Sequence, residues 1–212
     1  MDPLILLHPT YFPNIANIAI LAQRKCLWEV CDYYQKQTYR NRTYICTDQG
    51  KHMMTIPIQH VGGAQGKQFY KDVKVDNQYP WQRQHWRTLQ TAYRSSPFFE
   101  YYEDELAPLF HDRYEYLLDF NFRSIELAFE CLQLEMPSSK TTMYDPNPKN
   151  YRDMRFMVNA KRSVPFTPTT YTQVFVERHG FIGNLSILDL LFNEGTSAPT
   201  YLEEVSLSFL DA

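Results

Sequence analysis

The first thirty residues contain two short apolar runs with a helical pattern between them, and this arrangement limits the folds open to the chain. The run PLILL, residues 3–7, is wholly apolar, which is typical of a strand buried on both faces. Apolar residues then recur at helical spacing over residues 14–22, and CLWEV, residues 26–30, reads as a second strand. A strand, a helix and a strand in about 30 residues predict a βαβ unit with parallel strands and a right-handed crossover.

Later segments add antiparallel strands to this start. TYICT (43–47) and HMMTIPI (52–58) flank the sequence DQGK, in which Gly50 suits the turn of a hairpin. Alternating polar and apolar residues over 71–75 predict an exposed edge strand, and the glycine-rich residues 60–68 predict a loop. The hairpin makes the predicted sheet mixed.

The middle of the chain has a helical pattern. From Pro80 onward apolar residues recur every three or four positions, with a break predicted near Pro108 and a long helical pattern over 113–134. The proline-rich residues 137–170 are interpreted as a connecting arm outside the core. A late strand is expected over 172–176.

The size and composition of the chain suit one folded unit. With 212 residues, of which 44% are hydrophobic and 21% charged, the chain can bury a sizeable core. We expect one domain spanning residues 1–212, of the α/β class, with a mixed sheet, a βαβ start and an inserted helical bundle at about residues 80–136. A last helix is expected over 185–193, ended by Gly195.

Composition and motifs argue against several classes of protein. A net charge of −3 argues against a nucleic-acid partner bound through its phosphates. The four cysteines show no CxxC spacing, so no metal site is expected, and no nucleotide-binding or HExxH motif indicates a cofactor. The amino terminus lacks a signal-peptide pattern, and no segment reaches the roughly 20 apolar residues of a transmembrane helix. We expect a cytoplasmic protein with reduced thiols, and its oligomeric state is left open.

Two polar loops follow the first two predicted strands, at the edge where open α/β sheets bind ligands. The first loop, HPTYFP, brings His8, which can carry a proton near neutral pH, together with Tyr11 and Phe12, which can stack on a sugar or base. The competing interpretation is structural. In it His8 bonds a backbone carbonyl, and both rings close over the first helix.

The second loop, DYYQKQTYRNR (32–42), carries three cations within seven residues. Lys36, Arg40 and Arg42, with Asn41 beside them, predict a pocket for a phosphate or carboxylate, which an arginine can bind through two hydrogen bonds. A solvated charged face is the alternative interpretation.

The remaining candidates lie on predicted helices. His85 lies one helical turn after Trp81, where it either contacts a ligand or packs in the core. Asp189 is a charged residue within an otherwise apolar helical pattern, and a buried carboxylate needs a partner. Arg42 is our candidate for that partner. Ser186 is more typical of the first turn of a helix than of a nucleophile, because no GxSxG elbow surrounds it.

Five stretches, taken in order along the chain, resemble the WbqC-like family: HPTYFP, YRNRTYI, Trp81 with His85, YRSSPFFEYY and FIGNLSILDLLFNEG. Members of that family occur in gene clusters for O-antigen and other bacterial surface polysaccharides, and the family is similar to a proposed glycine transferase acting on sugars. The positions that match the family's motifs are His8, Pro9, Tyr11, Asn41, Arg42, Trp81, His85, Tyr93, Pro97, Phe99, Ser186, Asp189, Asn193 and Gly195.

The resemblance implies a transferase acting on a sugar or polysaccharide precursor of the O-antigen type, with glycine as one candidate for the transferred group. Its small-molecule partner would be an activated sugar or an amino-acid donor. A non-catalytic ligand-binding or assembly protein of the same pathway is the alternative; a nucleotidyltransferase relative is weaker, because a second histidine one turn on is missing. The candidate catalytic residues are His8, His85 and Asp189. The candidate substrate-binding residues are Tyr11, Phe12, Lys36, Arg40, Asn41, Arg42, Trp81 and Ser186.

Overall fold

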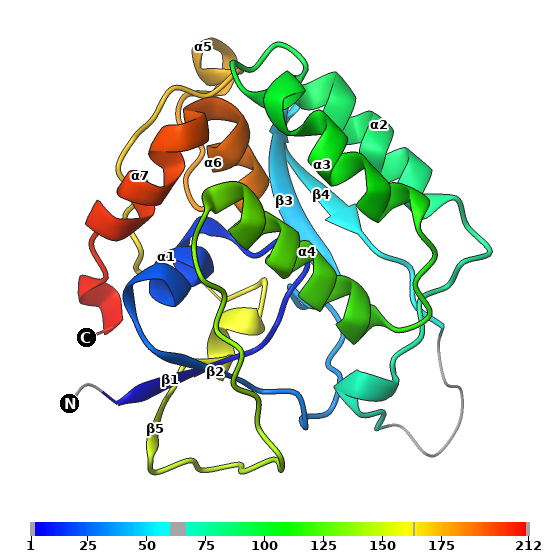
Figure 1. The fold of residues 1–212 in the computed structure, drawn as a ribbon, viewed down its shortest axis with the longest axis vertical. Helices are drawn as coiled ribbons and strands as arrows, with labels where there is room; N and C mark the ends of the chain where they lie inside the picture. Colours follow the sequence, from blue (N-terminus) through cyan, green and yellow to red (C-terminus); the bar gives the residue numbers. More distant parts are fainter. Residues whose placement is uncertain (1–2, 60–66, 163, 211–212) are drawn as a thin grey trace.

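The computed structural model describes residues 3–59, 67–162 and 164–210. Helices occur with both parallel and antiparallel strands, which confirms the predicted α/β class. Within the described residues the strands form two sheets, one of three strands and one of two. The two-stranded sheet lies among the helices, whereas the three-stranded sheet lies at the lower edge of the view (Figure 1). Most of the glycine-rich loop expected over 60–68 lies outside the described residues.

The predicted βαβ start is present. Strand β1 (Leu4–Leu7) is followed by helix α1 (Ile15–Gln23) and by strand β2 (Cys26–Trp28), which pairs with β1 in parallel. The side chain of Asn14 caps α1 by accepting the backbone N–H of Asn17, which satisfies a donor that the first helical turn leaves unpaired.

The third strand of this sheet comes from the proline-rich segment, so the expectation that residues 137–170 lie outside the core is wrong. Strand β5 (Tyr151–Asp153) pairs in parallel with the free edge of β1, which gives the order β2-β1-β5. The short 3₁₀ helix η2 (Arg155–Val158) follows it and buries Met157. The backbone hydrogen bonds offered by β1 outweigh the polar, unpatterned sequence of β5.

The predicted hairpin is also present, as a separate sheet. Strands β3 (Arg42–Thr47) and β4 (Gly50–Thr55) are antiparallel, and Gly50 takes a φ of +91° at the turn, which glycine adopts without steric cost. The edge strand expected over 71–75 is wrong. The 3₁₀ helix η1 (Tyr70–Asp72) occupies its first two residues, and only isolated bridges follow at Lys74 and Val75.

Three helices follow the hairpin in the region expected for the helical insertion. They are α2 (Trp81–Tyr93), α3 (Phe99–His111) and α4 (Leu117–Leu132), and α2 packs against β3 while α3 contacts both other helices (Figure 1). Helix α3 continues through Pro108 instead of breaking there, because Pro108 lies in its last turn.

The carboxyl-terminal part is helical. The strand expected over 172–176 is wrong: this stretch has no strand partner in the described residues and leads into the short helix α5 (Val176–His179). Helix α6 (Ile187–Glu194) ends at Gly195 as expected, and is followed by η3 (Gly195–Ser197), α7 (Ala198–Glu204) and η4 (Ser208–Leu210). None of the helices in the described ranges has both the length and the apolar character of a bilayer-spanning segment.

Candidate functional site

The carboxyl edge of the three-stranded parallel sheet gathers charged and titratable side chains, all of them buried except that of Asp153. His8 directly follows β1, Glu29 directly follows β2, and Asp153 is the last residue of β5. The loop after β2 adds two further members and the residue pair after β5 adds one. We call the set the sheet-edge cluster; its members are His8, Glu29, Asp32, Arg40, Asp153 and Arg155.

One half of the cluster is built around Asp32. Its Oδ2 atom accepts hydrogen bonds from Nε2 of His8 at 3.0 Å and from Nη2 of Arg40 at 2.9 Å. Arg40 has no exposed surface, and its guanidinium lies 5.1 Å from the centre of the Tyr70 ring. The two loops that follow β1 and β2 therefore meet, as the sequence predicted, and Arg40 supplies the guanidinium.

The other half of the cluster is built around Arg155. This guanidinium pairs with Oε2 of Glu29 at 3.1 Å and with Oδ2 of Asp153 at 2.7 Å. It also donates to the backbone carbonyl of Asp145 at 2.8 Å, and it lies 5.1 Å from the Tyr144 ring. The proline-rich segment is thereby attached to the sheet edge through charge as well as through β5.

Several polar atoms of this region are buried and have no hydrogen-bond partner among the residues that the structure describes. They are Nδ1 of His8, Oγ1 of Thr10, and Nε and Nη1 of Arg40. A buried polar group left unpaired costs about 1–3 kcal/mol, and native proteins carry few of them. Four such atoms within one loop pair are what a polar ligand would satisfy, so the cluster is the candidate functional site.

The protonation states of this site follow from its burial and its charges. Burial, reinforced by the charge of Arg40, lowers the pKa of His8 to about 4, although the hydrogen bond to Asp32 opposes that shift. Burial alone would raise the pKa of Asp32, but the hydrogen bond from His8 and the charge of Arg40 outweigh it and lower that pKa. Near neutral pH, His8 is therefore neutral and donates its Nε2–H to the Asp32 carboxylate. The lone pair of Nδ1 is left free to accept a proton.

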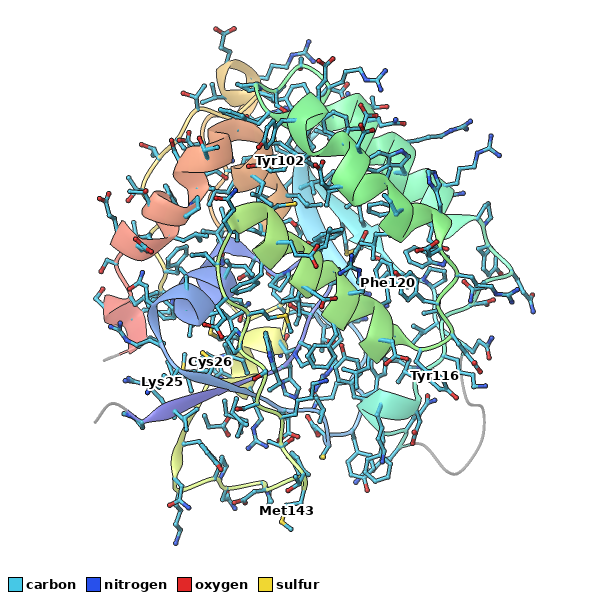
Figure 2. All side chains as sticks on the ribbon, viewed as in Figure 1. Lys25, Cys26, Tyr102, Tyr116, Phe120 and Met143 are labelled. Carbon is cyan, nitrogen blue, oxygen red and sulfur yellow. The ribbon has the colours of Figure 1, made fainter. Side chains whose placement is uncertain are left out.

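Tyr11 and Phe12 lie in the core instead of at a cavity wall, and neither has any exposed surface. The Tyr11 hydroxyl bonds Nδ1 of His85 at 2.9 Å, and the two rings stack with centres 5.7 Å apart. Trp81 contacts His85 edge-on and also packs on Phe120, which lies on α4 (Figure 2). This group of rings matches the structural interpretation of the first loop, since no ring face is open to a ligand.

Phe12 has a backbone φ of +35°, which non-glycine residues rarely adopt. Its carbonyl accepts hydrogen bonds from Thr43 at 3.1 Å and from Ser186 at 3.2 Å, and its N–H donates to Ser124 at 3.4 Å. Three separate segments of the fold therefore fix this residue in its unusual backbone conformation.

Asp189 and Ser186 belong to a different buried network. Asp189 accepts hydrogen bonds from the hydroxyls of Tyr93 at 2.6 Å and Tyr171 at 2.5 Å, and from Nε2 of Gln173 at 2.8 Å. These donors replace Arg42, so the expected Arg42–Asp189 pair is wrong. Ser186 caps α6 by accepting the N–H of Leu188, which agrees with the helix-start interpretation of its sequence.

Lys36, Asn41 and Arg42 line a separate cavity of about 490 Å³, together with residues that the sequence did not single out, among them Tyr34 and Tyr79. The predicted binding residues thus divide between two places. Arg40 joins His8 in the sheet-edge cluster, whereas the other two cations and Asn41 face the cavity.

Sequence reasoning missed four members of the cluster: Glu29, Asp32, Asp153 and Arg155. A signal was present for two of them. Glu29 is the one acid in the apolar run that predicted a strand over residues 26–30, and Asp32 opens the loop after that run. Asp153 and Arg155 carried no such signal, since nothing in their local sequence marks β5 as a strand.

Comparison with known proteins now adds to this geometry. The model of the WbqC-like protein family matches residues 9–163, well over half of the chain. The chain belongs to the WbqC-like protein family. Within the matched region lie all members of the sheet-edge cluster except His8, which directly precedes it.

A curated relative is similar over most of its length to this WbqC-like chain. It is the uncharacterized protein Rv1507c of Mycobacterium tuberculosis (strain ATCC 25618 / H37Rv), which is 30% identical over 195 residues. The aligned region covers 80% of this chain and 83% of the relative. No solved structure matches this chain.

Proposed function

We propose that this WbqC-like protein is a transferase acting on an activated sugar or another polysaccharide precursor, with the sheet-edge cluster as its reaction centre. The observation that carries the proposal is the unpartnered Nδ1 atom of His8, held beside a paired Asp32 and a fully buried Arg40. A neutral imidazole oriented by a carboxylate is the arrangement that general base catalysis requires.

The proposed step is acyl transfer from an aminoacyl ester or thioester to a hydroxyl or amino group of the sugar. The sugar oxygen or nitrogen attacks the acyl carbon and forms the new bond, while its proton moves to Nδ1 of His8. The bond between the acyl carbon and the leaving group then breaks, and the leaving oxygen or sulfur receives that proton. Asp32 keeps the imidazole in the correct tautomer and stabilises the imidazolium that forms between the two transfers.

Arg40 has a distinct part in this proposal. Its Nη2 is paired with Asp32, whereas Nε and Nη1 are donors without partners. Two N–H donors fixed on one planar group can hold the negative charge that develops on the acyl oxygen, or a carboxylate or phosphate of the donor. Asp189, Ser186 and His85 lie outside this centre, and in this proposal they serve the fold.

In this proposal the substrate approaches the centre beside residues 141–145, which contact the cluster. Thr141 donates to Glu29 at 3.0 Å, and Tyr144 lies where the charges of Asp32 and Arg155 act on its pKa, which burial raises. The ring of Tyr144 is 41% exposed and the neighbouring Met143 is 74% exposed, at the outer end of this segment (Figure 2). A substrate would reach the buried Nδ1 of His8 by displacing this segment.

Mass spectrometry of reaction mixtures tests the proposal. The protein is incubated with a panel of nucleotide sugars and aminoacyl donors, and products are sought whose mass equals that of the sugar plus the acyl group minus the one hydrogen that the acyl group replaces. We expect a product with the natural protein and with His85→Gln, and none with His8→Gln, when all three have the same circular dichroism spectrum. Product formation by His8→Gln at the natural rate would remove His8 from catalysis.

The alternative function is a non-catalytic ligand-binding or assembly protein of the same pathway. It needs no proton transfer at His8, and Nε and Nη1 of Arg40, which have no partner among the described residues, would serve a bound ligand as well as a reacting group. Binding of a panel member without any change of mass would support this alternative and contradict the transferase.

A further inference from the structure

The cavity that contains Arg42 is distinct from the sheet-edge cluster. It lies between the loop after β2 and the chain that follows β4, and residues 55–58 form part of its wall. We call it the Arg42 pocket, lined by Tyr34, Lys36, Asn41, Arg42, Asp76 and Tyr79 in addition to residues 55–58. Its volume of about 490 Å³ is in the range of small-molecule sites.

Two cations of the pocket lack carboxylate partners within the described part of the chain. Arg42 is half-buried, and its Nε atom is fully buried without a hydrogen-bond partner. Lys36 is exposed at the same cavity. No ion pair of either residue occurs among the described residues, although Asp76 lines the pocket, and one Asp76 oxygen accepts the backbone N–H of Gln78. A guanidinium fork and an ammonium with free donors are the groups that bind a phosphate.

A polar acceptor is fixed beside these cations. Asn41 is only 7% exposed, and its Nδ2 donates to the carbonyl of Ile56 at 3.0 Å. This bond determines the orientation of the amide, so its Oδ1 is left as a buried acceptor without a partner. A hydroxyl group of a bound molecule can donate to this Oδ1 atom. The occupant therefore carries both an anionic group and hydroxyl groups.

The remaining wall is aromatic. Tyr34 is half-buried and Tyr79 is 62% exposed, and both line the cavity. Tyrosine rings pack well on the C–H faces of a flat or ring-shaped ligand, while Asp76 offers a second acceptor for its hydroxyl groups. Taken together, the cations, the acceptors and the rings match the parts of one ligand.

We propose that the Arg42 pocket binds a sugar ring that carries a phosphate group. Arg42 and Lys36 hold the phosphate, Asn41 and Asp76 accept from sugar hydroxyls, and the tyrosines cover the ring. This proposal does not depend on catalysis at His8, because the pocket and the sheet-edge cluster have different lining residues. Sugar phosphates and nucleotides share this chemistry, and the experiment separates them.

Isothermal titration with four probes tests the proposal: glucose 1-phosphate, uridine 5′-diphosphate, glucose and inorganic phosphate. We expect saturable binding of at least one of the first two, at least tenfold tighter than glucose or inorganic phosphate. Whichever of the first two probes binds more tightly tells whether the pocket takes the sugar phosphate or the nucleotide. The proposal would be overturned if inorganic phosphate bound as tightly as the tighter of the first two probes, or if neither glucose 1-phosphate nor uridine 5′-diphosphate bound.

Matched variants place the binding in the pocket. Arg42→Gln and Lys36→Gln are each expected to lower the affinity for the probe by tenfold or more. Substitution of two exposed cations outside the pocket, Arg87→Gln and Lys25→Gln, is expected to leave that affinity unchanged. If Arg42→Gln fails to fold, the exposed Lys36→Gln still decides the question against Lys25→Gln. Equal losses in the pocket variants and their controls, or no loss in either pocket variant, would contradict the assignment.

Discussion

The imidazole Nε2 of His8 lies 3.0 Å from Oδ2 of Asp32, although 24 residues separate the two in the chain. The same oxygen accepts a hydrogen bond from Nη2 of Arg40. A single carboxylate atom therefore balances the charge of a buried guanidinium and orients a buried imidazole. Folding and the proposed chemistry therefore depend on the same carboxylate, and substitutions at Asp32 affect both.

Asp32→Asn is expected to lower the free energy of unfolding by about 3 kcal/mol, because it leaves the guanidinium of Arg40 buried without its counter-charge. Urea denaturation followed by circular dichroism measures the change. The control is Glu126→Gln, which removes one partner from the partly exposed pair with Arg123 and is expected to leave the midpoint nearly unchanged. Equal midpoints for natural protein and Asp32→Asn would show that Arg40 does not need this carboxylate.

Stability is expected to fall as the pH drops from 6.5 towards 4. The folded pKa of His8 is lowered from 6.5 to about 4, so in this window the unfolded chain takes up a proton that the folded protein does not. Each such histidine lowers the free energy of unfolding by about 1.4 kcal/mol for each pH unit of the drop, or by about 2 kcal/mol between pH 6.5 and pH 5. Above pH 6.5 this contribution is constant.

Urea denaturation at pH 7 and pH 5 checks this dependence. His8→Gln is expected to reduce the loss of stability at pH 5 by about 2 kcal/mol relative to the natural protein. Burial lowers the pKa of His85 to about 4 as well, so His85→Gln is expected to have a similar effect. The raised pKa of Asp189 acts in the opposite sense at lower pH but is common to all three proteins. An unaltered pH dependence in His8→Gln would contradict the buried neutral imidazole.

Asp189→Asn is expected to destabilise the protein by about 1.5–3 kcal/mol, because the amide cannot accept from the Tyr93 and Tyr171 hydroxyls and from Gln173 together. The exposed Asp104→Asn on α3 serves as the matched control and should unfold like the natural protein. Transfer activity per folded molecule should be unchanged in Asp189→Asn. A specific loss of activity at full stability would instead return Asp189 to the catalytic candidates.

Gly195→Ala is expected to lower the stability of the folded protein much more than Gly180→Ala does. Both glycines have positive φ values, +54° and +68°, so the backbone strain of about 1–3 kcal/mol is comparable. A Cβ at Gly195 would overlap the ring of Phe98, whereas a Cβ at Gly180 meets no atom within 4 Å. Thermal melting of the two variants isolates the steric effect. Equal melting temperatures would mean that the Phe98 ring moves aside freely.

Local patterns predicted the parts of the fold that form locally. The βαβ start and the hairpin each lie within a short stretch of sequence, and their apolar patterns match the faces that they bury. The three residues Tyr151–Asp153 have no such pattern and become a strand only because β1 has a free edge. Conversely, residues 172–176 have strand composition, but the side chain of Gln173 bonds the backbone of Ile182, and the chain turns into α5.

The meeting of the two loops was predictable, but the pairing of their side chains was not. The rule that ligands bind beyond parallel strands led to His8 and the loop after β2, and the structure brings these two segments together. Lys36, Arg40 and Arg42 were predicted to line one pocket. The structure separates Arg40 from the other two cations because Asp32, eight residues before Arg40, supplies the charge that permits its burial. Such a pairing depends on the path of the loop, which a local sequence pattern does not contain.

The late position of β5 has a consequence for synthesis of the chain. Arg155 and Glu29 are 126 residues apart, so their pairing waits until nearly three-quarters of the protein has left the ribosome. Closing so long a loop is slow compared with local folding. Until then Glu29 lacks the guanidinium of Arg155, and a nascent or truncated chain ending before residue 151 carries His8 without a finished sheet edge around it.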